Sequence, residues 1–475
     1  MLQKNHKYHR NKAIYSSFWI VLFTIFGFLG FFLRDYLMAK VYGFGSQLDT
    51  FYLVTMIPMF MVTIFCVPFG QAIVPKLKKT RDMDIFRFSK MVRYFAFFAF
   101  FFCLFLCLLT YLLSDFAFFG LHYLGWIKLD VNIKFMQITV LPILLLSGLV
   151  ILCNAILSAN ERYIYPSIAQ LIVPIFAICF LLIFGKSYGV YAVILGMFLG
   201  QFANFIVVNY GLKLDGVELL PLETKSNISK NSFFWRGYSH LVAIAIFSVS
   251  LMPINTFIAS SLGSGAISVF NLGNKFSLFV IGVLTTLFAT VLLPYLTRLS
   301  TYQNKNILNK ETFYLLFFST FIFIPFSLLG FIYANFISKL IFNQIANESA
   351  TVLGIASVIK YSVIQLPFWV FNAIIFKHAN AINKVGIVLL STIIMLVLNI
   401  ILSLSLIKFM NVGGLSLATT ISCAIASIIM LINYVFKKYL KLFEGVVFLI
   451  IWFVFGIILI RLNFNAFLIL LERLM

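Results

Sequence analysis

Long apolar runs separated by short polar segments extend along the whole chain. A membrane-spanning helix needs about 20 apolar residues to cross a hydrocarbon core roughly 30 Å thick. By that criterion the sequence predicts thirteen spans, near residues 14–34, 48–75, 92–114, 133–158, 164–185, 188–212, 238–262, 267–296, 312–338, 350–376, 385–408, 412–436 and 444–461. The apolar tail at 463–471 is too short to cross, so it forms either a partial fourteenth span or a helix at the membrane surface.

Composition supports an all-α integral membrane protein. Of the 475 residues, 62% are hydrophobic and only 10% are charged. A soluble domain carries roughly a quarter charged residues, so a soluble fold of this size would lack the polar groups to cover its surface. Lipid is the solvent that removes this problem.

The net charge of +21 would first suggest nucleic-acid binding, but the distribution of the charge argues against it. Lys and Arg lie in short clusters between the apolar runs. If the N-terminus is cytoplasmic and the spans alternate, 24 of these residues fall in cytoplasmic segments and 9 on the other side. Cytoplasmic loops carry such an excess of positive charge. The pattern predicts a multi-pass membrane protein with a cytoplasmic N-terminus.

The chain divides into two halves of six spans at its longest hydrophilic stretch. We expect an N-terminal lobe at 1–212, a cytoplasmic linker at 213–237, a C-terminal lobe at 238–436 and one or two extra helices at 437–475. The segments that start at Phe51 and Phe270 align without a gap at an offset of 219, and Pro75 then coincides with Pro294. Since six is even, both halves enter from the same side, which predicts two pseudo-symmetric lobes around a central cavity.

Polar residues inside spans are rare here, and such residues usually face a cavity or a partner. Arg34 and Asp35 end the first predicted span, and Asp49 opens the second. These three residues are either a charged rim at the cavity or an ion pair at the outer membrane surface that only anchors the helices. The sequence alone does not separate the two interpretations.

The eighth predicted span carries a polar face. Asn271, Asn274 and Lys275 lie on one side of a helix together with Leu278. A polar face in a membrane helix points into the bundle, so we expect Lys275 to serve the cavity, with structural hydrogen bonding as the alternative. Lys360 in the tenth span is a weaker candidate because it has fewer polar neighbours.

Several classes of function find no support in the sequence. There is no Walker A motif, no HExxH motif, no pair of carboxylates within one span and no Ser–His–Asp set, so we expect neither an enzyme nor a bound cofactor or metal ion. The six cysteines lie in apolar runs. Cys103 and Cys107 are one helical turn apart but have no His or carboxylate beside them, which favours small core side chains over a metal or redox site.

A cavity with cations and almost no anions would suit an anionic substrate, such as the phosphate of a lipid carrier. Lys and Arg would hold the head group while the lipid tail stays in the bilayer. Transport would then require the two lobes to open the cavity to each side in turn.

Two blocks of the sequence resemble a known family. GFFLRDYLMAKVYGFGSQLDTFYL, followed by IPMF and FGQAIVPKL, resembles the first two helices of the MviN/MurJ lipid II flippases. INTFIASSLGSGAISVFNLGNKF, with GVLTTLFATVLLPYL, is similar to their helices seven and eight. The resemblance implies the fold of the multidrug/oligosaccharidyl-lipid/polysaccharide exporter superfamily. It also implies a polyprenyl-linked glycan lipid as the partner substrate.

The resemblance assigns roles to three residues. Arg34 matches an essential cavity arginine, Asp49 matches the family's aspartate, and Lys275 stands where the family has an arginine. Lysine keeps the charge but loses the bidentate fork of a guanidinium. Near Phe28 and Val62 the family usually has further arginines, which this chain lacks, and its C-terminal end is shorter.

Four hypotheses follow. The motifs favour a flippase for a lipid II-like peptidoglycan precursor. The missing arginines favour a flippase for an O-antigen, capsule or exopolysaccharide intermediate, for which glycan polymerases and glycosyltransferases are candidate partners. A multidrug exporter would be expected to carry intramembrane carboxylates. A membrane-bound glycosyltransferase would be expected to carry acidic residues or large external domains, whereas the outward loops here are short.

Overall fold

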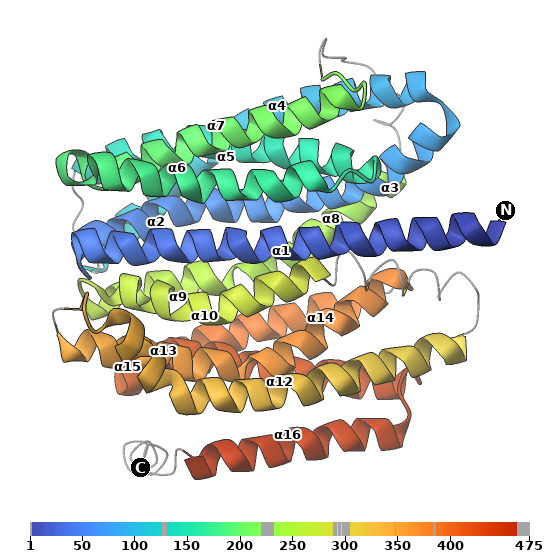
Figure 1. The fold of residues 1–475 in the computed structure, drawn as a ribbon. Coiled ribbons are helices and arrows are strands. Elements are labelled where there is room, and N and C mark those ends of the chain that lie inside the picture. Colours follow the sequence, from blue (N-terminus) through green and yellow to red (C-terminus); the bar gives the residue numbers. More distant parts are fainter. Residues whose placement is uncertain are drawn as a thin grey trace. The chain divides into compact units, whose positions relative to one another are not determined.

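The computed structural model describes residues 2–125, 131–219, 232–287, 292, 296, 305–346, 348–382 and 386–462, and within these ranges every regular element is helical (Figure 1). The predicted tail at 463–471, part of the predicted linker and most of the last turns of the span at 267–296 lie outside the described residues.

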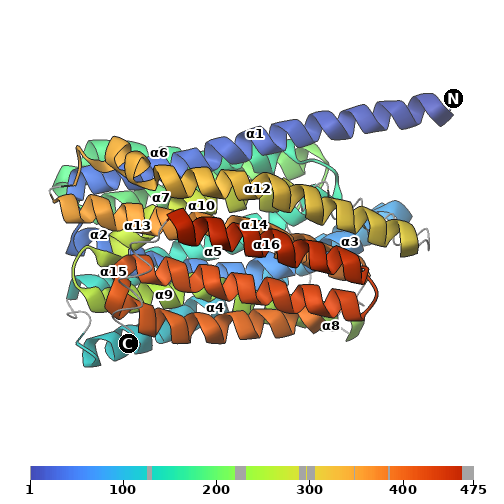
Figure 2. The same cartoon turned by 90° about the horizontal axis from the view of Figure 1, so that it is seen from below.

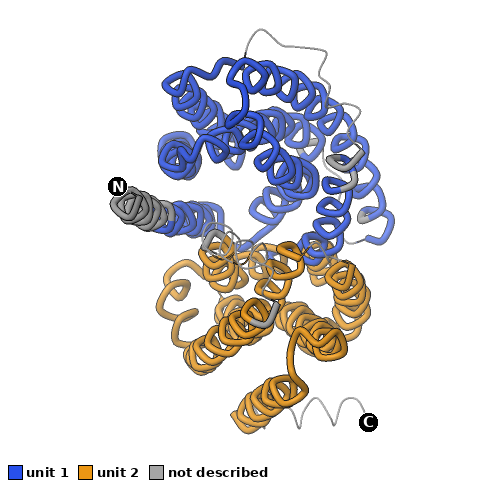
Figure 3. Tube along the Cα trace, turned by 90° about the vertical axis from the view of Figure 1, so that its right-hand side faces the viewer, with its two compact units in different colours: residues 1–253, 263–265 blue, residues 254–262, 266–475 orange. Residues whose placement is uncertain are grey.

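The described chain forms two compact units (Figure 3). Unit 1 comprises residues 1–253 and 263–265, and unit 2 comprises residues 254–262 and 266–475. The helices of unit 1 are α1 (Leu2–Tyr42), α2 (Ser46–Met61), a π-helical turn (Val62–Cys66), α3 (Val67–Met83), α4 (Ile85–Tyr123), α5 (Val131–Ala159), α6 (Ile164–Tyr188), α7 (Val190–Leu214) and α8 (Ser232–Val249).

Unit 2 begins within α9 (Leu251–Ala259), which a short 3-10 turn (Ser260–Leu262) follows. Its further helices are α10 (Ala266–Leu287), α12 (Lys305–Phe342), α13 (Ser349–Ile364), α14 (Leu366–Ala381), α15 (Gly386–Phe436) and α16 (Leu442–Leu462). In this unit α12 contacts α13, α14 and α16, and α13 packs between α10 and α15 (Figure 2).

Small residues bring the helices of unit 1 close together. Gly196 and Gly200 of α7 form a GxxxG pair that faces α6, and a Cβ atom on Gly196 would lie 2.8 Å from the Phe176 carbonyl oxygen. A Cβ atom on Gly200 would lie equally close to Val173 Cα. Apolar surface alone does not drive helices together in lipid, so such close backbone contacts carry much of the association.

Aromatic packing fixes α3, α4 and α8 against one another. Phe69 of α3 contacts Phe95 and Phe98 of α4 and Tyr238 of α8, with ring centroids between 5.3 and 5.9 Å apart. Tyr238 also donates a hydrogen bond to the carbonyl oxygen of Phe65 in the π-helical turn, at 3.3 Å. A π-turn leaves backbone groups without their usual helical partners, so α8 stabilises an interruption that the sequence did not reveal.

Eleven described helices are long and apolar enough to cross a membrane, and twelve if the bent pair α13 and α14 counts as one span. The prediction of an all-α membrane protein is therefore confirmed. The bend of 42° falls at Gln365, two residues before Pro367 in the first turn of α14. Proline lacks a backbone N–H and disfavours a straight helix through this point.

Helix α15 folds back on itself. Asn411 has non-helical angles (φ 49°, ψ −135°), and the Asn399 amide donates to the Thr419 hydroxyl at 3.1 Å. Residues 20 positions apart in a straight helix would be about 30 Å apart. The 51-residue element is therefore a hairpin whose arms meet at Asn411.

Candidate functional site

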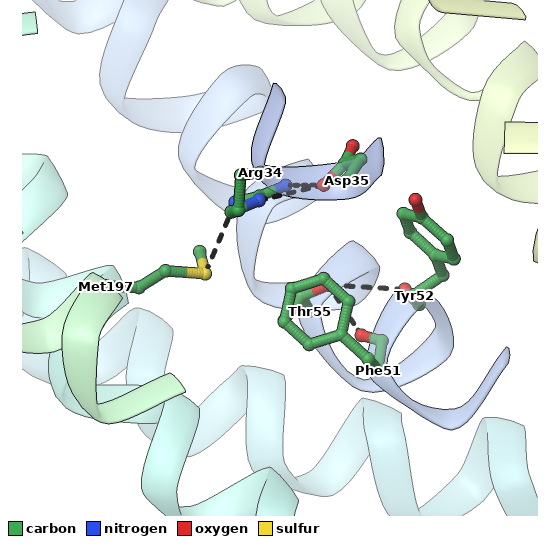
Figure 4. Close-up of polar contacts among 6 residues, drawn as sticks. All are labelled: Arg34, Asp35, Phe51, Tyr52, Thr55 and Met197. Carbon is green, nitrogen blue, oxygen red and sulfur yellow. Dashed lines mark hydrogen bonds and ion pairs between the residues drawn. The ribbon is translucent and has the colours of Figure 1, made fainter. Parts of the chain in front are cut away.

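The ion pair of Arg34 and Asp35 lies on α1 of unit 1, and both residues are buried (Figure 4). Both Nε and Nη2 of Arg34 donate to Oδ1 of Asp35, at 2.8 and 2.5 Å. The exposed fractions of the two residues are 6% and 0%. The helix continues beyond them to Tyr42, so the pair lies within the span and not at its end, where the sequence placed it.

Side chains of α1, α2 and α7 enclose the Arg34 guanidinium. Its Nη1 donates to the Met197 sulfur at 3.4 Å, and its Cζ lies 5.3 Å from the Phe31 ring centroid and 5.4 Å from that of Phe51. Tyr52 lies next to Asp35 in the same group (Figure 4). Cation–π contacts of this length stabilise a charge that has lost water.

Asp49 holds a backbone turn in place. Its Oδ2 accepts a hydrogen bond from the N–H of Gly265 at 2.6 Å, and its exposed fraction is 6%. Gly265 has a φ of +89°, and a Cβ atom there would lie 2.9 Å from the Phe44 carbonyl oxygen. Both the positive φ and the close approach require glycine. The turn before α2 and the turn before α10 thus meet at Asp49.

The predicted polar face of α10 is largely bonded to its own helix. The Asn271 amide donates to the Ile267 carbonyl oxygen at 3.0 Å, and the Asn274 amide donates to that of Phe270 at 3.1 Å. Asn274 is buried, whereas Asn271 and Lys275 are half-buried. Both asparagine amides therefore have structural partners within the helix.

The structure does not bring Lys275 and Lys360 together. A Cβ atom on Gly273 would lie 2.5 Å from a Val358 methyl group, so that face of α10 contacts α13. Lys275 is two residues further on, which places it on the opposite face of α10. Lys360 is likewise two residues beyond Val358, and its Nζ lies 4.6 Å from the Phe331 ring centroid on α12.

Unit 2 also contains a buried network of neutral polar side chains that the sequence did not assign. The Asn255 amide donates to the Thr419 hydroxyl at 2.8 Å, and the Ser403 hydroxyl donates to the Asn255 side-chain oxygen at 2.9 Å. Asn399 also donates to Thr419. The sequence feature that indicates this network is the i, i+4 spacing of Asn399 and Ser403 within one apolar run, which places both side chains on one face of a helix.

The thiols of Cys66 and Cys103 meet in unit 1 beside Gly148. A Cβ atom on Gly148 would lie 2.2 Å from the Cys103 sulfur and 3.3 Å from the Cys66 sulfur. All six cysteines are free, and the described residues contain no group of three or more side chains that could hold a metal ion. These two cysteines, one in the π-helical turn and one in α4, pack as core side chains beside α5.

A family model, "Lipid II flippase MurJ", matches residues 38–471. The chain belongs to this family. The match begins after Arg34 and Asp35 and includes Asp49, Lys275 and Lys360. Because the MurJ family is a family of flippases, the chain is a transporter and not an enzyme, and it is a multi-pass membrane protein.

Two relatives named "Probable lipid II flippase MurJ" are similar to the chain at low identity. The protein of Buchnera aphidicola subsp. Acyrthosiphon pisum is 24% identical over 419 residues, which cover 85% of this chain and 80% of that protein. The protein of Borreliella burgdorferi is 22% identical over 275 residues, 58% of this chain and 54% of that protein's length.

Solved structures of transporters share the fold of the chain. A lipid II flippase MurJ in an inward closed conformation has a TM-score of 0.71 at 19% identity, covering 93% of this chain and 98% of that one. The Vibrio cholerae MATE transporter VcmN has a TM-score of 0.65 at 14% identity, covering 89% and 96%. A MOP superfamily transporter from Pyrococcus furiosus has a TM-score of 0.64 at 12% identity, covering 89% and 95%. At these identities the likeness concerns the fold.

Proposed function

We propose that this MurJ-family member moves a polyprenyl-pyrophosphate-linked glycan precursor of the lipid II type across the bacterial inner membrane by alternating access. The family match over residues 38–471 is the observation that carries this proposal. The N-terminus would be cytoplasmic, as the distribution of Lys and Arg favours.

The proposed architecture has thirteen spans. The arms of the α15 hairpin would each cross the membrane, and α13 with α14 would form one bent span. Residues 1–212 and 238–436 would be the two lobes around a central cavity, 213–237 the linker between them, and 437–475 an extra C-terminal segment. In this arrangement the rocking of the lobes would expose the site to each leaflet in turn.

Arg34, Asp49 and Lys275 are the residues proposed to handle the substrate head group. The Arg34 fork now holds Asp35, so a pyrophosphate would have to replace that carboxylate as the partner of Arg34. Asp35 would then keep the guanidinium oriented until substrate arrives. Lys275 would add a point charge. Asn271, Asn274 and Lys360 would be secondary contributors, because each already has a partner within unit 2.

Complementation of a strain depleted of its own lipid II flippase tests the proposal. Arg34→Ala and Lys275→Ala should each abolish growth, whereas Lys40→Ala, which removes an exposed lysine from the same helix as Arg34, should support it. Removing Arg34 alone breaks a buried ion pair by taking away one partner, which costs about 3–5 kcal/mol. Arg34→Gln combined with Asp35→Asn avoids that penalty and should still fail.

Transport of lipid II in reconstituted vesicles gives the decisive readout. If the variant with Arg34→Gln, Asp35→Asn and Lys275→Ala moved lipid II at the rate of the unchanged protein, the assignment of these residues to the head group would be wrong. If the unchanged protein moved no lipid II but restored surface polysaccharide to a strain lacking its O-antigen flippase, the alternative substrate class would replace lipid II. The lack of arginines at Phe28 and Val62 is the observation that favours that alternative.

A further inference from the structure

The turn between α3 and α4 carries three large apolar side chains that are almost fully exposed. Met83, Ile85 and Phe86 have exposed fractions of 76%, 74% and 80%. Single exposed apolar residues are ordinary on a protein surface, but three within one four-residue turn form a patch. The patch lies wholly within unit 1.

The turn is rigidly built. Asp84 is the N-cap of α4, and its Oδ1 accepts hydrogen bonds from the N–H groups of Phe86 at 2.8 Å and Arg87 at 3.3 Å. The Asp84 N–H in turn donates to the Thr80 carbonyl oxygen at 2.9 Å. A side-chain cap of this kind stabilises the first turn of a helix. The three apolar side chains are therefore presented by ordered backbone.

Exposed cations surround these apolar side chains. Lys79 and Arg81 lie in the last turns of α3, and Arg87 and Lys90 lie in the first turns of α4, all of them exposed. Arg87 forms an ion pair with Asp84 at 3.3 Å, and Asp82 adds one further carboxylate. The cations outnumber these two carboxylates, so the turn combines apolar side chains with net positive charge.

The same combination recurs in unit 2. The turn between α15 and α16 exposes Phe436, Leu442 and Phe443 together with three lysines, Lys437, Lys438 and Lys441. Lys438 has a φ of +57°, which turns the chain sharply at the end of α15. The same kind of surface therefore occurs once in each unit, which points to the same environment at both turns. The bilayer is the environment that both units have in common.

The distance of the α3–α4 turn from the uncharged part of α4 is consistent with a location in the lipid headgroup layer. Residues 94–114 carry no charge and span about 31 Å as a helix, which matches the hydrocarbon core. Arg93 would then mark the edge of the core, with Arg87 and Lys90 above it. Phe86 would lie about 10 Å beyond Arg93. Amphipathic segments with apolar and basic residues bind at this depth.

We propose that the α3–α4 turn is a binding surface for anionic phospholipid head groups, with Met83, Ile85 and Phe86 inserted among them. On the proposed topology this surface lies in the cytoplasmic leaflet. The basic residues attract the acidic lipids, each contributing roughly fivefold to partitioning at full effect. The α15–α16 turn has the same chemistry and would bind the same lipids. Through these contacts each unit would be anchored at the leaflet surface independently of the other.

A fluorescent label on Phe86→Cys tests the insertion. Cys179→Ser first removes the exposed native thiol, and a bimane label is then attached at position 86. The labelled protein is reconstituted in vesicles of phosphatidylcholine alone or mixed with phosphatidylglycerol. We expect quenching by brominated lipid and several-fold protection from aqueous iodide in the mixed vesicles. A label on Glu218→Cys, an exposed residue in another polar segment, should remain open to iodide.

The charge requirement is tested by changing Lys79, Arg81, Arg87 and Lys90 to Gln together. In this variant, phosphatidylglycerol should no longer increase the protection of the label at position 86 from iodide. Changing the exposed Lys40 and Lys339 to Gln should leave that increase intact. A label at position 86 that iodide reaches freely in both kinds of vesicle would overturn the proposal and indicate a protein partner instead. The measurement requires no transport, so its outcome is separate from that of the complementation test.

Discussion

At the scale of single residues, Gly148 shows how tightly unit 1 is packed. Its Cα faces the sulfur atoms of Cys66 and Cys103, and a methyl group there would overlap Cys103 at 2.2 Å. Real Cβ atoms do not approach sulfur so closely, and both thiols are buried. Cores of this density accept added methyl groups only when a neighbour moves.

Gly148→Ala should therefore destabilise the protein by about 1–3 kcal/mol. Thermal unfolding in detergent should show a lower Tm, and Cys103→Ala in the same chain should restore most of the loss because it removes the overlapping sulfur. Gly120→Ala is the matched control, since no atom lies within 4 Å of a Cβ atom there. Equal Tm changes at the two glycines would contradict the packing.

The buried pair of Arg34 and Asp35 shows which site features a sequence conveys. The rarity of charge in apolar runs was enough to select both residues. Their burial was not predictable, because Met197 and Phe51 enclose the guanidinium from distant positions in the chain. Adjacent residues on a helix do not usually face each other, so the ion pair itself depends on the long arginine side chain and its tertiary surroundings.

At the scale of the helices, Asn255 connects α9 with both arms of α15. It bonds Thr419 on the second arm and Ser403 on the first. Asn255 and Ser403 are almost completely buried, and Asn399 joins the same network. Removing Asn255 takes away the acceptor of the buried Ser403 hydroxyl, which costs more than one hydrogen bond.

A double-mutant cycle measures this connection. Asn255→Ala and Ser403→Ala should each lower the Tm, and together they should be less harmful than the sum, with a coupling of about 0.5–3 kcal/mol. Asn255→Ala with Ser391→Ala is the control, because the Ser391 hydroxyl donates to the Ile387 carbonyl oxygen of its own helix. Additive effects for Asn255 and Ser403 would show that the network does not join the helices.

Hydropathy predicted where helices lie better than where they end. The apolar run at 385–408 and the one at 412–436 correspond to the two arms of α15, and the break at Asn411 falls between them. By contrast, α1 continues to Tyr42, well past the predicted end near residue 34. Tertiary contacts stabilise the helix beyond the apolar run. The Tyr42 hydroxyl, for example, donates a hydrogen bond to the Gly189 carbonyl oxygen at 2.7 Å. Hydropathy does not contain that information.

At the scale of the whole molecule, the family and the helical membrane fold agree with the sequence motifs, whereas the orientation remains a prediction. It depends on the excess of Lys and Arg in alternate loops. It also depends on each arm of the α15 hairpin crossing the membrane once. One straight helix of 51 residues would be about 77 Å long, more than twice a hydrocarbon core of about 30 Å.

Cysteine accessibility in intact cells tests both points at once. In the Cys179→Ser background, single substitutions at Lys186, Lys339 and Asn411 should react with a membrane-impermeant maleimide added outside. Substitutions at Lys213 and Lys441 should react only after the membrane is opened. Reaction of Lys213→Cys from outside would reverse the orientation. If Asn411→Cys reacted only from inside while Lys339→Cys reacted from outside, α15 would not form two spans. The substrate site would then have to be sought in a bundle of fewer than thirteen spans.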